Sequence, residues 1–149
     1  MKSKKGLKRF AAILFVFTML MSLLPIEVMA TESITVYASV VRNGEFTTGK
    51  NNDPIAHVPV TLDSASPTID KAFISLHETY YKDGTSGYET TQMIYGNSVT
   101  KFWGVESEYV GYYHNNNYAN GLTDVLENGA HLVFWFYQDT ARWSDEITG

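Results

Sequence analysis

The chain of 149 residues contains no cysteine. This absence excludes a disulfide framework, a thiolate zinc site, an iron–sulfur cluster, a cysteine nucleophile and a lipid anchor attached through cysteine. The sequence also lacks a G-x-S-x-G motif and a glycine-rich phosphate loop. Its length corresponds to one domain, which excludes an enzyme with separate cofactor and substrate domains.

Positive charge is rare outside the N-terminus. Residues 1–9 hold five of the eleven Lys and Arg residues, and an apolar run follows over residues 10–24. Pro25 then precedes Val28 and Ala30, the small residues expected before a cleavage site. The run is short for a membrane span of about 20 residues. The pattern therefore predicts a secretory signal peptide over residues 1–30, cleaved after Ala30.

The remaining residues, 31–149, contain six basic and fifteen acidic residues, a formal net charge of −9, together with eighteen aromatic residues. An acidic surface repels phosphate backbones and anionic lipids, so neither nucleic acid nor, after signal cleavage, a membrane is an expected partner. An exported domain without disulfides must be stabilised by its aromatic core. We expect a secreted, extracellular protein, and the lack of cysteine suits a Gram-positive or anaerobic secretion route.

One segment of residues 31–149 has helical periodicity, and several others alternate as strands do. The apolar residues at 69, 72, 73, 76 and 80 form a single stripe, with a cap at residues 66–68 and a stop at Asp83-Gly84. One helix among several strands predicts an α+β fold, with one sheet and a single helix packed on one face. Strands are expected at 34–41, 57–62, 96–103, 109–114 and 130–138, with a polar loop over 43–54.

The last predicted strand is bulky on both faces. Leu132, Phe134 and Phe136 point one way and Val133, Trp135 and Tyr137 the other. A single helix can cover only one of these faces. The second face is therefore either covered by segment 43–54 or 84–97, or left as an exposed aromatic surface that could bind a partner.

Several segments occur in an order known from one family. They are ITVYASVV, PTIDKAFISLHETYY, GYET, NSVTKFWG, EYVGYYHNNN, LTDVLENGAHLVFWFYQD and WSDE. Together they resemble the transcobalamin-like C-terminal domain family, a domain-of-unknown-function family of secreted and surface proteins of Gram-positive bacteria. The resemblance implies a small β-grasp-like domain that forms one module of a larger surface protein. In animal cobalamin carriers the related domain closes over a bound corrinoid.

The chain departs from this family in two places. Ala130 stands where the family usually has an aspartate after Asn128-Gly129, so no role of that aspartate is carried over. The family also tends to continue beyond the WSDE segment with a further aromatic segment. We therefore expect the domain, residues 31–149, to be truncated at its C-terminus.

Residues with catalytic or metal-binding potential form no recognised pattern. Glu106 and Glu108 are close in sequence, but they are expected to be solvated surface charges. His77-Glu78 lacks the second histidine of H-E-x-x-H, because residue 81 is tyrosine. The four histidines are far apart in sequence, so surface or half-buried roles are expected. The sequence predicts no enzyme, no metal and no cofactor.

Aromatic and amide side chains suit the recognition of sugars, peptides or a macrocycle, although each tyrosine could equally pack in the core and each asparagine could serve a turn. We predict a non-enzymatic recognition or adhesion/spacer module whose partner is an unknown extracellular ligand or protein. The alternative is a corrinoid-binding domain, with cobalamin or a similar corrinoid as ligand. The candidate ligand-binding residues are Trp103, Tyr112, Tyr113, Asn117, Tyr118 and Trp135.

Overall fold

The computed structural model describes residues 32–107 and 109–138. The predicted signal peptide and its cleavage site, Glu108 and the WSDE segment lie outside the described residues. Within them the fold is α+β, as predicted, with one α-helix, one short 3₁₀ helix and nine strands. No helix in this part of the chain is long and apolar enough to cross a bilayer.

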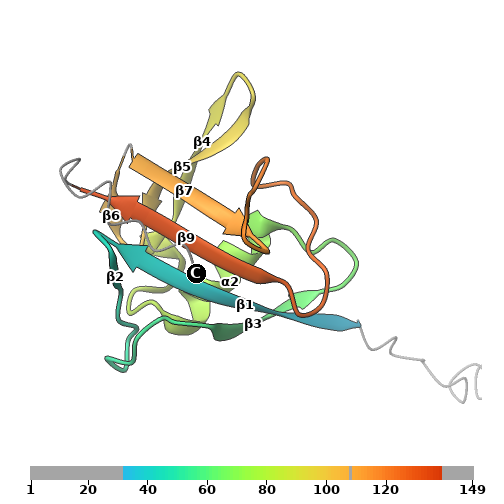
Figure 1. Cartoon of the computed structure of the whole chain (residues 1–149), viewed down its shortest axis with the longest axis horizontal. Coiled ribbons are helices and arrows are strands. Elements are labelled where there is room, and N and C mark those ends of the chain that lie inside the picture. Colours follow the sequence, from blue (N-terminus) through green and yellow to red (C-terminus); the bar gives the residue numbers. More distant parts are fainter. Residues whose placement is uncertain (1–31, 108, 139–149) are drawn as a thin grey trace, which may run out of the picture. The chain divides into compact units, whose positions relative to one another are not determined.

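The larger sheet is organised around β1 (Ser33–Arg42), which pairs antiparallel with β3 (Val58–Asp63). The other edge of β1 pairs parallel with β9 (His131–Tyr137), the last described strand. This mixed arrangement, with the first and last strands side by side, gives the β-grasp-like order (Figure 1). The remaining strands of this sheet are β7 (Tyr109–His114) beside β9, β8 (Asn117–Tyr118) beside β7, and β2 (Glu45–Phe46) beside the end of β1.

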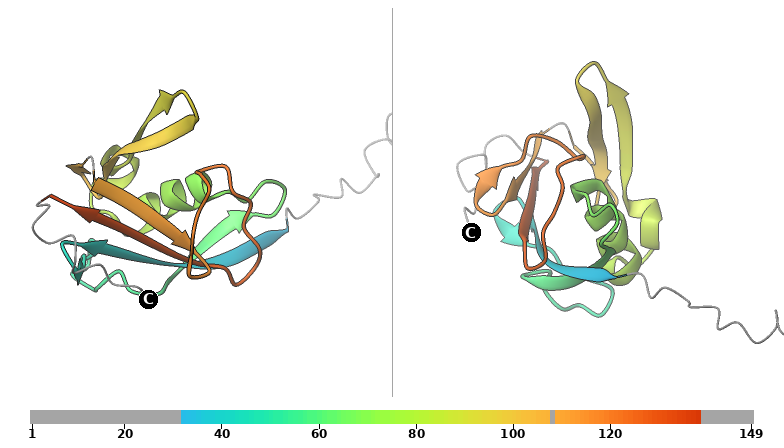
Figure 2. Two further views of the ribbon diagram at one scale, coloured as in Figure 1. Left: turned by 45° about the horizontal axis from the view of Figure 1, so that its top comes forward. Right: turned by 90° about the vertical axis from the view of Figure 1, so that its right-hand side faces the viewer.

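Helix α2 (Ile69–Tyr80) covers one face of this sheet (Figure 2). It covers the predicted apolar stripe from Ile69 to Tyr80 and ends before the predicted stop at Asp83-Gly84. The Thr68 side chain caps the first turn by accepting a hydrogen bond from the Lys71 backbone N–H. The stripe is buried and packs against the inward-facing strand residues in one core. Members of this core include Ile69, Ala72, Phe73 and Leu76 from the helix and Val36, Val40, Leu132, Phe134 and Phe136 from the sheet.

The prediction of a single sheet is wrong. Strands β4 (Glu89–Met93), β5 (Gly96–Phe102) and β6 (Val105–Glu106) form a second sheet, and its β4–β5 hairpin projects from the domain (Figure 2). Segment 84–97, one of the two segments considered as a cover for the second face of the sheet, holds the 3₁₀ helix η1 (Gly84–Gly87) and all of β4. Every residue of β4 is exposed, and its sequence has no alternation of apolar and polar residues that would predict a strand. Its extended conformation comes from pairing with β5.

Two aromatic residues on the face of the larger sheet opposite the helix are buried rather than exposed. Trp135 is 3% exposed and Tyr137 0%, and both cluster with Val41. Segment 84–97 does not contribute to this cluster; it lies on the helix side, where Tyr88 packs edge-on against Phe73. Trp135 and Tyr137 therefore belong to a small second core.

Candidate functional sites

The six predicted ligand-binding residues divide between the two sides of the larger sheet. Tyr112 lies on the helix side, half-buried, with its ring 5.7 Å from that of Phe73. Trp103 follows β5 and is also on the helix side, with 7% of its surface exposed. For these two residues the arrangement agrees with core packing, the alternative left open by the sequence.

Tyr113, Tyr118 and Trp135 lie on the opposite side, whereas Asn117 pairs with His114 and is on the same side as Tyr112. The rings of Tyr113 and Tyr118 lie 4.4 Å apart across the β7–β8 hairpin, beside the exposed Asn117. Trp135 lies flat over Gly111 of the neighbouring strand, where an added Cβ would be 2.3 Å from an indole carbon. The structure thus brings Tyr113, Asn117 and Tyr118 together at one turn.

Trp103 has an unusual backbone conformation. Its φ is 52° and that of Gly104 is 74°, so the pair forms a tight turn between β5 and β6 in the left-handed region. Bulky aromatic residues rarely adopt this conformation, and they keep it only where the surroundings fix it. Here the Trp103 backbone N–H donates to Nε2 of His77 at 3.0 Å, and its indole Nε1–H donates to the Thr48 carbonyl oxygen at 3.0 Å.

His77 is fully buried in α2, which corrects the expectation of a surface or half-buried histidine. Because Nε2 accepts the Trp103 N–H, the ring proton is on Nδ1, which donates to the Phe73 carbonyl oxygen at 2.7 Å. Burial removes water from the charged form and lowers the pKa of His77 to about 4, although the bond to Phe73 opposes this shift. His77 lies four residues after Phe73 on the apolar stripe, so the periodicity could have revealed its burial, but not its partner Trp103.

Four chain segments meet around Trp103 and line a cavity of about 590 Å³ that is open to solvent. They are the end of β1, the segment from Phe46 to Asn52, the two residues after α2 and the β5–β6 turn. Three basic side chains line this cavity, which we call the basic cavity: Arg42, Lys50 and Lys82. A second cavity, of about 650 Å³, lies between the β4–β5 hairpin and β7 and is lined by Glu89 and Glu106.

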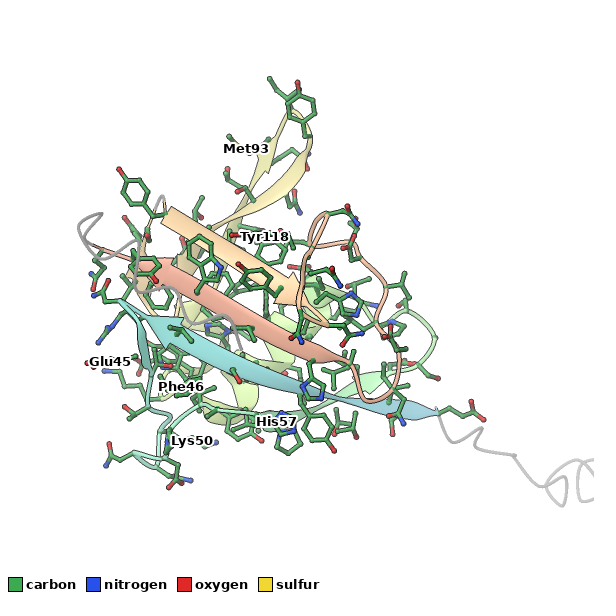
Figure 3. The ribbon with its side chains drawn as sticks, in the orientation of Figure 1. Glu45, Phe46, Lys50, His57, Met93 and Tyr118 are labelled. Carbon is green, nitrogen blue, oxygen red and sulfur yellow. The ribbon has the colours of Figure 1, made fainter. Side chains whose placement is uncertain are left out.

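The β4–β5 hairpin ends in exposed apolar side chains. Met93 is 56% exposed, Ile94 93% and Tyr95 100%, and Ile94 and Tyr95 form the turn (Figure 3 labels Met93). Residues 90–100 contain no charge, and an ion pair of 2.6 Å between Lys101 and Glu89 lies at the base. None of these three apolar residues is among the ligand-binding residues predicted from the sequence. The available signal was an apolar Met-Ile-Tyr triplet followed by glycine inside an otherwise polar segment.

Two histidines that are far apart in sequence are neighbours in the fold. The ring centroids of His57 and His131 lie 4.6 Å apart, and Tyr37 stacks on His57 at 4.4 Å. Tyr37 and His131 face each other because β1 and β9 are parallel neighbours, a pairing that no local pattern shows. The described residues contain no group of three or more His, Asp or Glu side chains able to hold a metal ion.

The fold and these sites define a small β-grasp-like α+β domain with two cavities and an apolar hairpin tip. No protein-family model and no curated protein matches the chain.

Proposed function

We propose that residues 31–149 form a secreted, non-enzymatic recognition or adhesion module that binds a protein partner through the β4–β5 hairpin. Secretion is inferred from the signal sequence over residues 1–30. The resemblance to the transcobalamin-like C-terminal domain family suggests that the domain lies beside other modules of a cell-surface protein. The observation that carries the proposal is the exposure of Met93, Ile94 and Tyr95 at the hairpin tip.

The composition of the tip supports a role outside the domain. Ile94 and Tyr95 occupy both central positions of the hairpin turn without a positive φ, and the positive φ of 120° falls on Gly96. Neither side chain is buried in the domain, so neither contributes packing energy to the fold. Burial of one such side chain in a partner would yield about 1.5–3 kcal/mol. Exposed apolar side chains that gain nothing inside the fold indicate a binding surface.

The outer strand of the hairpin supports a protein partner. In the described part of the chain β4 pairs only with β5, so its other edge is open. Residues 90–93 include no charge and no proline, the features that usually prevent edge-to-edge pairing. An extended partner segment can therefore add to β4 while the tip enters an apolar pocket. An anionic bilayer is disfavoured because residues 31–149 are acidic and the tip carries no cation.

The two titratable groups with the largest changes in pKa support a non-enzymatic role. His77 uses both ring nitrogens to hold Phe73 and Trp103. Burial, together with the nearby Asp70 carboxylate, raises the pKa of the Tyr88 hydroxyl far above its ordinary value, and this hydroxyl donates to Asp70 at 2.7 Å. Both groups are committed to structural hydrogen bonds.

Site-specific photo-crosslinking on the producing cells tests the proposal. A photoreactive residue replaces Gln92 on β4, and a matched control places it at Glu78, exposed on α2. We expect a discrete protein adduct from position 92 only, lost when Ile94→Ser and Tyr95→Ser are introduced. The same adducts from both positions, lipid adducts alone, or an adduct that survives the serine variants would contradict the proposal.

Corrinoid binding is the second candidate, and one observation favours it. The rings of Tyr113 and Tyr118 lie 4.4 Å apart at an interplanar angle of 38°, and together they offer an aromatic surface on the β7–β8 hairpin. Equilibrium dialysis of the exported protein against cobalamin and a base-free corrinoid tests this candidate. Retention at micromolar affinity that Tyr118→Ser abolishes would support it. No retention by a folded sample would eliminate it.

A further inference from the structure

The geometry points to an anion-binding site in the basic cavity, for a small ligand that carries at least two negative charges on phosphate or carboxylate groups. The site is separate from the hairpin and independent of the function proposed for it. Its volume of about 590 Å³ is within the range of about 300–1,000 Å³ that is usual for small-molecule sites.

The distribution of charge carries the inference. Residues 31–149 hold only six basic residues against fifteen acidic ones, yet three of the six line this cavity. No Asp or Glu is among the lining residues. An acidic domain that concentrates half of its cations around one cavity creates a local positive potential against its overall charge. That potential selects anions.

The cations are largely available for a ligand. Within the described residues Arg42 and Lys50 form no ion pair, and Lys82 contacts only Asp83, at 3.9 Å, with both side chains mainly exposed. Glu45 lies opposite Arg42 in the β1–β2 register but does not form an ion pair with it (Figure 3 shows Glu45 and Lys50 at this end of the sheet). Arg42 offers the planar donor fork that suits carboxylate and phosphate oxygens.

One wall of the cavity is aromatic and held by hydrogen bonds. Trp103 is fixed by its bonds to His77 and Thr48, and the Tyr81 hydroxyl lies close against Gly104, where an added Cβ would be 2.0 Å away. Phe46, which is 44% exposed, adds an apolar side chain to the lining. A ligand with a flat or apolar body next to its anionic groups fits this combination.

Isothermal titration calorimetry of the exported protein tests the inference with three probes. Phenyl phosphate and citrate carry the two candidate anionic groups, and benzyl alcohol is the uncharged comparison. We expect binding of at least one anion, weakening with ionic strength, and no binding of benzyl alcohol. Binding of phenyl phosphate alone would assign a phosphate ligand, and binding of citrate alone would assign a polycarboxylate. Binding of both would show that the site recognises anions with at least two negative charges of either kind.

Variants separate a defined site from general attraction. Arg42→Gln combined with Lys50→Gln should weaken binding by about tenfold or more. Lys71→Gln, which removes an exposed charge from α2 outside the cavity, should leave it unchanged. The indole N–H resonance of Trp103 in the unsubstituted protein should shift as anion is added. No binding by folded protein, equal weakening in Lys71→Gln, or an unmoved Trp103 resonance would overturn the inference.

Discussion

The buried His77 makes the stability of this domain depend on pH in a calculable way. Its pKa is about 4 in the folded protein, against an ordinary value of 6.5. Because the folded value is lower, the unfolded chain binds more protons between these limits. The contribution of neutral His77 is therefore complete above pH 6.5 and is lost as the pH falls towards 4. A difference of this size corresponds to about 3 kcal/mol, with a slope of about 1 kcal/mol per pH unit near pH 5.

Urea denaturation at pH 7, 6 and 5, followed by far-UV circular dichroism, measures this slope. His77→Gln removes the titrating group but keeps a side-chain oxygen that can accept the Trp103 N–H. This variant should be less stable than the natural protein at pH 7, and its slope between pH 6.5 and 5 should be smaller by about 1 kcal/mol per pH unit.

Leu76→Val is the matched control, because it shortens a fully buried neighbour on the same helix without changing a titratable group. It should lower the free energy of unfolding by about 1 kcal/mol at every pH and leave the slope unchanged. Carboxylates titrate in all three proteins, so the difference between slopes isolates the histidine. Identical slopes for the natural protein and His77→Gln would refute the assignment of a neutral, desolvated histidine.

Three substitutions test other parts of the fold in the same urea assay at pH 7. Gly111→Ala should destabilise the protein by about 1–3 kcal/mol, because the added Cβ would overlap the Trp135 indole. The control Gly121→Ala should be nearly neutral, because its added Cβ would have no atom within 4 Å. Equal effects of the two substitutions would contradict the packing of Trp135 on Gly111. Phe73→Ala should cost about 3–5 kcal/mol because the ring is 1% exposed at the centre of the aromatic core, and a cost below about 1 kcal/mol would be incompatible with that position. Thr68→Ala should cost about 1 kcal/mol by removing the helix cap, and an unchanged midpoint would show that the cap is not used.

Local sequence patterns were sufficient to predict a helix or strand where one face of the element is buried and the other is exposed. The apolar stripe of α2 gave the bounds of the helix, because helical spacing directs Ile69, Phe73 and Leu76 into one core. Alternation likewise located β1 and β9. β4 could not be found this way, since all five residues are exposed and only pairing with β5 makes them a strand. For such a segment, the neighbouring strand with which it forms hydrogen bonds determines that it is extended.

The candidate sites depended still more on tertiary structure. By itself the sequence determined the acidic character of residues 31–149, the absence of cysteine chemistry and a single helix among strands. It also marked Trp103 as an aromatic residue of interest, but not its bonds to His77 and Thr48. Arg42, Lys50 and Lys82 are scattered through forty residues and look like ordinary surface charges. Only the folding of four separate segments around one cavity places them together, because the contacts between these segments are long-range and leave no local pattern.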